Sequence, residues 1–180
     1  MAPPQRRNLV NIEVDDMRTK MLTEGEYSAL LPLLSGDNRL AVEVAAGTGL
    51  RIDDCLSLPA AAAEGMISIR QRKTGKLKCI CIPWELRQRL LARGQESQWL
   101  FPSPRASCPG HRHRSTLYRA IRRAWLATGG DPARTIAPHS LRKLYARRLY
   151  ERSGCIELVQ SALGHSCLAT TLLYVFAPER

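Results

Sequence analysis

The side chains most able to do chemistry in this chain stand in a few short segments. His139-Ser140-Leu141-Arg142 is followed by Leu163-Gly164-His165, and Tyr174 comes nine residues later. Upstream, Thr48-Gly49-Leu50-Arg51 adds a second arginine. Arginine grips phosphate oxygens with a bidentate fork, histidine transfers protons near neutral pH, and tyrosine can form a covalent ester. Each motif is common by itself, but together these groups are suited to attack a phosphodiester with a phenol.

Such an attack makes definite demands on the surroundings of the tyrosine. Free tyrosine titrates near pH 10, so almost none of it is phenolate at neutral pH. A base or a strongly cationic field must activate it, and two arginines supply that field where transition-state charge develops. The departing alkoxide needs an acid, which a lysine can provide. Because the arginine pair can neutralise the phosphate, we expect no metal ion and no cofactor.

The charge of the chain favours a nucleic-acid partner. The formal net charge is +11, from 27 Lys and Arg against 16 Asp and Glu. Residues 1–90 carry 13 basic and 11 acidic side chains, whereas residues 91–180 carry 14 and 5. Arginine outnumbers lysine by 22 to 5, which favours planar phosphate recognition. A solvated basic face or a codon bias toward arginine would give the same composition.

Nothing in the sequence predicts export or a membrane. The apolar stretch after the basic start is too short for a signal core, and no apolar run approaches the roughly 20 residues that span a bilayer. The six cysteines form no Cys-x-x-Cys pair, so we expect them to be reduced, as in the cytoplasm. The segment from Cys108 to His113 lacks a fourth nearby zinc ligand, and we interpret it as a basic loop.

The first half of the chain predicts three helices and then a hairpin. Thr23-Glu24-Gly25-Glu26 is a capping box for the first helix, and Asp37-Asn38 can cap the second. Leu50-Arg51 opens the third, which continues to about Leu58 before Pro59. The period then changes to two, which predicts strands at 66–70 and 77–82 joined by a basic tip.

The second half reads as helices again. After a helix over 84–92 and a loop over 103–114, we expect a helix capped by Ser115, one from Pro138 to Arg152, one from Ile156 to Leu163, and a last one capped by Ser166. The predicted fold class is therefore mainly α with a small antiparallel β-sheet, an α+β architecture.

In this order, the motifs resemble the tyrosine recombinase (phage integrase) family. The family pattern is an Arg after a Thr-Gly-Leu turn, a Lys in a β-hairpin, His-x-Leu-Arg, Leu-Gly-His, and a Tyr on the next helix. Besides the segments above, it is matched here by Lys73-Thr74-Gly75 and by Thr170-Thr171-Leu172-Leu173-Tyr174. The resemblance covers about residues 18 to 177, nearly the whole of a catalytic domain of that family.

The resemblance implies a role for each matched position. Tyr174 would attack the scissile phosphate and leave a 3′-phosphotyrosyl link with a free 5′-hydroxyl. Arg51 and Arg142 would clamp the non-bridging oxygens. Lys73 would protonate the departing 5′-oxygen. The remaining matched positions are His139 and His165, expected as base and hydrogen-bond donor, and Asp54, expected to steady the site.

Some single assignments stay open at the level of sequence. An alternative role for Asp54 is only to offset the charge of Arg51 in a buried pair. Lys76 and Lys78 compete with Lys73, which matches the family because it precedes the Thr-Gly turn; the other two are expected to touch the DNA backbone. Tyr118, Tyr145 and Tyr150 are alternative phenols, and for Tyr145 and Tyr150, five apart on the His139 helix, packing is the default. Further phosphate contacts are expected from Arg112, Arg114, Arg119, Arg122 and Arg123.

The sequence departs from the family at both ends. We expect residues 1–20 to be a lead-in or linker and residues 21–180 to be the catalytic domain, with the usual N-terminal core-binding domain absent. Only six residues follow Tyr174, where family members usually carry a tail that docks on a neighbouring subunit. The resemblance implies tetramers on double-stranded DNA. From the short ends we expect weak DNA binding, weak self-association and poor strand exchange.

The sequence thus predicts the catalytic domain of a site-specific recombinase, an integrase of a mobile element. A related enzymatic alternative is a type IB topoisomerase, which shares the chemistry but relaxes supercoils. A non-enzymatic alternative is a catalytically silent DNA-binding module that regulates a full-length integrase.

Overall fold

The computed structural model describes residues 19–72, 75, 77–93, 97–104 and 110–176. The described part is mainly helical with one two-stranded antiparallel sheet, which confirms the predicted fold class. In chain order, the helices and strands are α2 (Glu24–Leu30), α3 (Gly36–Thr48), α4 (Ile52–Leu56), β1 (Ile67–Arg70), β2 (Leu77–Ile80), α5 (Trp84–Leu91), α6 (Arg114–Ala127), α7 (Pro138–Ser153), α8 (Ile156–Leu163) and α9 (Leu168–Val175). A 3-10 turn at Leu31–Leu33 lies between α2 and α3, and another at Ala60–Ala63 lies between α4 and β1.

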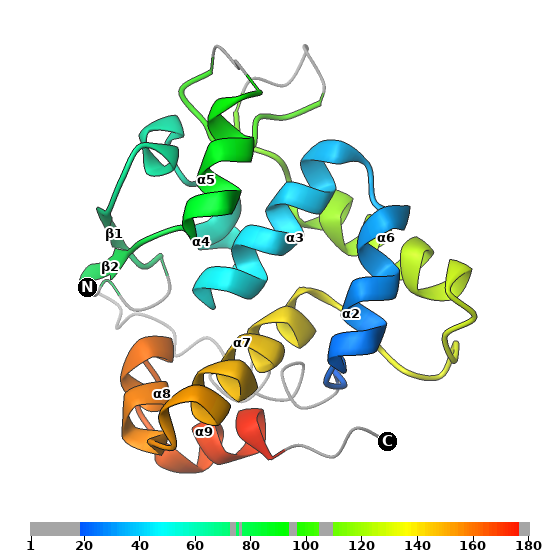
Figure 1. The fold of residues 1–180 in the computed structure, drawn as a ribbon, viewed down its shortest axis with the longest axis vertical. Coiled ribbons are helices and arrows are strands. Elements are labelled where there is room, and N and C mark those ends of the chain that lie inside the picture. Colours follow the sequence, from blue (N-terminus) through cyan, green and yellow to red (C-terminus); the bar gives the residue numbers. More distant parts are fainter. Residues whose placement is uncertain (1–18, 73–74, 76, 94–96, 105–109, 177–180) are drawn as a thin grey trace, which may run out of the picture.

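The hairpin forms where the alternating pattern predicts it. Ile67 pairs with Ile80, and Ile69 pairs with Lys78. Figure 1 places β1 and β2 at the left edge of the molecule, beside α4 and α5. Alternation along β2 turns Lys78 and Ile80 toward the protein, while Cys79 is exposed. One face of the hairpin therefore packs on the helical body.

Local signals set most helix ends, with some corrections. The capping box is present, because Thr23 N donates to Glu26 Oε2 at 2.9 Å and Glu26 N donates to Thr23 Oγ1 at 3.2 Å. The helix from Pro138 ends at Gly154, whose φ of 62° is the left-handed conformation that glycine favours. Three predicted caps were displaced: α3 begins after Ser35, α6 after His113 and α9 after Cys167.

Helix α7 joins two hydrophobic clusters. Its first half contributes Leu141 and Leu144 to the main core, which also takes side chains from α2 to α6. Its second half contributes Ala146 to a smaller cluster with α8 and α9, which includes Tyr174. Figure 1 shows this arrangement, with α7 running between α3 above it and the α8–α9 pair below. Residues near the start of α7 therefore lie where the two clusters meet.

Among the described residues, no single helix is long and apolar enough to cross a membrane, although the sharply bent pair α8 and α9 passes by length and composition when taken together.

Candidate active site

Arg142 ties two of the sequence motifs together. It is 2% exposed, and its Nη1 donates to the Gly49 carbonyl while its Nη2 donates to the Leu163 carbonyl. Gly49 belongs to the Thr-Gly-Leu-Arg segment after α3, and Leu163 to the Leu-Gly-His segment after α8. Segments that lie 93 and 21 residues away in sequence thus meet at one guanidinium.

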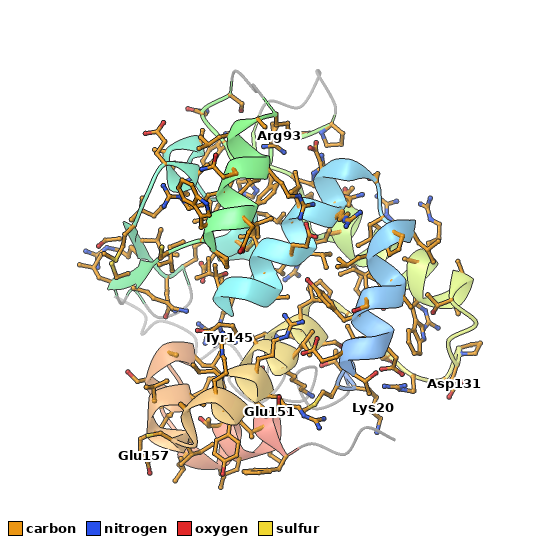
Figure 2. All side chains as sticks on the ribbon, viewed as in Figure 1. Lys20, Arg93, Asp131, Tyr145, Glu151 and Glu157 are labelled. Atoms are coloured by element: carbon orange, nitrogen blue, oxygen red, sulfur yellow. The ribbon has the colours of Figure 1, made fainter. Side chains whose placement is uncertain are left out.

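Gly49 allows this close approach. It ends α3 in the left-handed conformation, with φ 62°. A Cβ at Gly49 would lie 2.2 Å from Cδ1 of Tyr145, which is one turn after Arg142 on α7. Figure 2 labels Tyr145 where α7 faces the end of α3. The absence of a side chain at this glycine therefore lets α7 pack against the Arg51 segment.

Arg51 carries a buried donor that pairs with none of the described residues. It is the N-cap residue of α4, and its buried Nη1 atom has no hydrogen-bond partner in the part of the chain that the structure describes. An unpaired buried donor of this kind usually costs about 1–3 kcal/mol, and more when it is charged. Asp54, one turn later, has the complementary defect, because its buried Oδ2 also has no partner. A bound anion would satisfy the Arg51 donor.

The other oxygen of Asp54 holds the hairpin. Arg72 N donates to Asp54 Oδ1 at 3.0 Å, and Arg72 directly precedes Lys73. The turn itself is closed by Gly75 N, which donates to Gln71 O at 2.8 Å. Asp54 thus anchors the residue next to the expected proton donor. Lys73 and Lys76 themselves lie outside the described residues.

Lys78, which the sequence predicts to touch the DNA backbone, lies beside the arginine pair. Its Nζ donates to the Thr48 carbonyl at 3.3 Å, next to the carbonyl that Arg142 uses. Burial, together with repulsion from Arg142 and Arg51, lowers the pKa of Lys78 to about 8, while Asp54 acts in the opposite direction. Arg51, Arg142 and Lys78 therefore form a cluster of cations beside the carboxylate of Asp54.

Tyr174 and His165 lie against each other in the smaller cluster. Tyr174 is 3% exposed, and its ring meets that of His165 edge to face, with centroids 4.8 Å apart. Thr171, one turn before Tyr174 on α9, places its Oγ1 3.1 Å from His165 Nδ1. The Leu-Gly-His segment is thereby fixed to the helix that carries the tyrosine. His139 stands in the first turn of α7, half-buried.

The arginines expected on DNA do not all face solvent. Arg112 is 5% exposed, and it donates to Asp37 Oδ2 at 2.7 Å and to Asn38 Oδ1 at 2.8 Å, so its contacts are internal. Arg122 donates to the carbonyls of Pro132 and Arg134. The more exposed members of the set are Arg114, Arg119 and Arg123. Arg114 also lies 3.4 Å from Asp53 on α4, near the arginine pair.

Two further residues reach the site that the sequence did not single out. Gln71 directly follows β1 and is buried beside Gly164. A Cβ added to Gly164 would lie 3.4 Å from Gln71 Oε1. Lys143, next to Arg142, lies over the Tyr174 ring. The helical spacing could have indicated this position of Lys143, because Lys143 shares one face of α7 with Ala146 and Tyr150. Ala146 belongs to the smaller cluster, and Tyr150 packs against it. No group of His, Cys, Asp and Glu in the described part could hold a metal ion.

Comparison with known proteins identifies a family for nearly the whole chain. Residues 20–179 match the model of the Phage integrase family. A tyrosine recombinase XerA from Pyrococcus furiosus is 29% identical over 180 residues, covering 94% of this chain and 62% of the relative. A tyrosine recombinase XerD from Rhizobium meliloti is 31% identical over 195 residues, covering 99% of this chain and 60% of the relative.

A solved structure gives the same result. A crystal structure of a lambda integrase(75-356) dimer bound to a COC′ core site superposes with a TM-score of 0.73 at 25% identity, over 91% of this chain and 60% of that one. The chain thus spans less than two thirds of the length of these relatives.

Proposed function

This chain belongs to the phage integrase family, and from that membership we propose that it is the catalytic domain of a site-specific tyrosine recombinase. It would cleave and rejoin double-stranded DNA through a covalent 3′-phosphotyrosyl intermediate at Tyr174, in the integration or excision of a mobile element. Neither DNA relaxation nor a silent regulatory module is favoured by relatives that are named recombinases.

One observation carries the proposal. Arg142 links Gly49 to Leu163, and this brings the Arg51 segment, the Leu-Gly-His segment and the start of α7 into one place. The unpartnered Nη1 of Arg51 and the ammonium of Lys78 lie in the same cluster. Three cations beside one carboxylate repel one another, and a phosphodiester would relieve that repulsion.

The proposed roles follow from these positions. Arg51 and Arg142 clamp the non-bridging oxygens, where charge builds as Tyr174 attacks, and Lys78 adds a third cation. The bond from phosphorus to the 5′-oxygen breaks, and Lys73 gives that oxygen a proton. His139 and His165 assist as base and hydrogen-bond donor. Asp54 positions the hairpin through Arg72.

The decisive experiment is trapping of the covalent intermediate. The chain is incubated with a nicked suicide substrate that carries its cognate site, found by sequencing the DNA beside its gene. We expect a covalent protein–DNA band from the wild-type chain. Tyr174→Phe should abolish the band, because the nucleophile is gone. Tyr150→Phe is the matched control, since Tyr150 packs edge to face on Phe176 near the same cluster.

Three results would overturn the proposal. A band that persists in Tyr174→Phe would show that another residue is the nucleophile. Binding with no band on any cognate substrate would instead favour a silent module, and relaxation of supercoiled DNA lacking the site would favour a topoisomerase.

The proposal also names partners and a compartment. The partner is double-stranded DNA, on which copies of the chain would associate, as the lambda integrase dimer does on its core site. We place this activity in the bacterial cytoplasm, where reduced cysteines and accessible DNA are found together.

A further inference from the structure

The ring of Tyr174 lies against both a histidine and a buried ammonium. His165 meets one side of it edge to face, and Nζ of Lys143 stands 5.6 Å from the ring centroid. Lys143 comes from α7, directly after Arg142, and Tyr174 comes from α9. Consecutive residues of a helix point about 100° apart. Helix α7 therefore presents Arg142 to the phosphate-binding segments and Lys143 to the tyrosine.

Lys143 is buried as deeply as the residues around it. It is 4% exposed, and its ammonium donates to the Thr19 carbonyl. Burial of an ammonium costs several kcal/mol before its contacts are counted, whereas an apolar side chain of similar length would fill the same space without that cost. A lysine at this position therefore calls for an interaction that uses its charge.

Thr19 is itself held in place. The amide of Lys20 donates to the Thr135 carbonyl at 3.0 Å, just before α7, and the next two residues, Met21 and Leu22, are fully buried. The acceptor for Lys143 is thus fixed to the body of the protein. The side chain of Lys143 is held from one end by the helix and from the other by this carbonyl, with the tyrosine ring beside its charged group.

We propose that Lys143 is a positioning residue for the nucleophile, whose ammonium holds the Tyr174 ring against His165 and stabilises the negative charge that develops on the phenol oxygen. The inference rests on the proposed function, because it takes Tyr174 as the nucleophile. In the reaction, the phenol proton passes to a base as the bond from the phenol oxygen to phosphorus forms. The bond to the 5′-oxygen breaks with its electron pair, and that oxygen is protonated. Lys143 keeps its proton throughout.

The chief competing role is a structural tie between Thr19 and α7. Two neutral variants separate the two roles. Lys143→Met loses both the charge and the hydrogen bond, whereas Lys143→Gln loses the charge but keeps a donor for the Thr19 carbonyl. Lys143→Arg keeps both. Lys20→Met is the matched control, because it removes a cation from the residue next to Thr19 and leaves Lys143 in place.

Single-turnover cleavage of the nicked substrate is measured across pH. We expect both neutral variants to be roughly 10- to 30-fold slower at neutral pH, the range of a desolvated cation–π contact. The defect should narrow as the pH rises, because hydroxide then removes the phenol proton without help. Lys143→Arg and Lys20→Met should stay within about threefold of wild type. Wild-type rates in Lys143→Gln, or equal slowing at every pH, would overturn the proposal.

A second measurement needs no DNA and so is independent of the proposed function. Subtracting the ultraviolet titration of Tyr174→Phe from that of the parent chain isolates the ionisation of Tyr174. We expect Tyr174 to ionise at a higher pH in Lys143→Gln than in the wild-type background. An unchanged titration would reject the role of Lys143 even if cleavage by Lys143→Gln is slow. A shifted titration with no covalent band in the wild type would support the contact and reject the proposed function.

Discussion

At the scale of single residues, Arg51 offers the cleanest test of the phosphate site. Its Nη1 has no hydrogen-bond partner among the described residues, so removing the side chain breaks no described hydrogen bond of that atom. We expect Arg51→Ala to lower the single-turnover cleavage rate by roughly 10²- to 10³-fold, as for loss of one transition-state donor, with the thermal midpoint almost unchanged. Arg51→Lys should recover only part of the rate, because it lacks the planar fork.

The control for Arg51 is Arg39→Ala, which removes a surface arginine paired with Glu43 at 3.5 Å. This variant should cleave normally. A large fall in the thermal midpoint of Arg51→Ala would instead indicate that Arg51 holds the fold, and the loss of cleavage would then say little about phosphate binding.

Lys78 predicts a pH dependence of DNA binding. Burial and the nearby Arg142 and Arg51 lower its pKa to about 8, so the side chain is an ammonium below that pH and a neutral amine above it. We expect DNA affinity, measured at constant salt, to weaken as the pH rises through 8. Lys78→Met should bind more weakly at pH 7 and lose that step. A step that persists unchanged in Lys78→Met would assign it to another group.

As the pH rises above 8, the free energy of unfolding should increase, whereas DNA affinity should fall. The folded-state pKa of Lys78 lies below the ordinary value of 10.5, so between pH 8 and 10.5 the unfolded chain binds more protons. The free energy of unfolding of wild type, relative to Lys78→Met, should therefore rise over that window by roughly 2–3 kcal/mol. Chemical denaturation of both proteins at each pH measures it. A flat difference would mean that Lys78 is not buried as the structure has it.

At the scale of elements, the packing of α7 on the end of α3 depends on Gly49. Gly49 and Gly154 both end helices with φ 62°, but only at Gly49 would a Cβ meet a ring, at 2.2 Å. Gly154→Ala should cost about 1 kcal/mol, the price of the left-handed conformation. Gly49→Ala should lower the free energy of unfolding by clearly more, because the Tyr145 ring must move. That movement would also disturb the hydrogen bond from Arg142 to the Gly49 carbonyl.

Denaturation midpoints and cleavage rates of the two alanine variants measure this difference. Tyr145→Ala added to Gly49→Ala should recover part of the lost stability by removing the clash. Equal costs in Gly49→Ala and Gly154→Ala would show that the end of α3 can shift away from α7.

Local sequence signals predict the helices and strands well, but they predict less well which side chains contact one another across the fold. The hairpin, the span of α8 and the glycine stop of α7 depend on residues close in sequence, and they are confirmed. The inward face of Lys78 follows from its alternation with the buried Ile80, but its place beside Arg51 and Arg142 depends on contacts between residues distant in sequence. The pairing of Arg112 with Asp37 could not be predicted, because 75 residues separate the partners and no local pattern links them.

The site shows the same division. The order of motifs predicted which segments converge, and the contacts of Arg142 with Gly49 and Leu163 provide a physical reason for that convergence. The sequence did not predict Lys143 over Tyr174. Such a contact depends on the angle between α7 and α9, which is set by packing in the smaller cluster.

At the scale of the whole molecule, the site lies where two hydrophobic clusters meet. Arg51, Lys78 and Asp54 stand on elements of the main core, whereas Tyr174 belongs to the smaller cluster of α7, α8 and α9. Arg142 and Lys143 connect the two from the middle of the assembly. Relative movement of the clusters would therefore change the distance between the cations proposed to bind phosphate and the proposed nucleophile, Tyr174.

The net charge of +11 gives the last prediction, which concerns salt. Each phosphate contact releases counterions, so the logarithm of the DNA-binding constant should fall linearly with the logarithm of salt concentration, with a slope of about −0.9 per contact. Arg119 and Arg123 are exposed and are expected to contact phosphates. Arg119→Ala and Arg123→Ala should therefore each reduce the magnitude of the slope by about 1. Arg112→Ala should leave the slope unchanged and lower stability instead, because Arg112 is buried on Asp37. Filter binding over a salt series, with denaturation of each variant, separates the two effects. A slope near zero for the wild-type chain would mean that the basic surplus does not serve DNA binding.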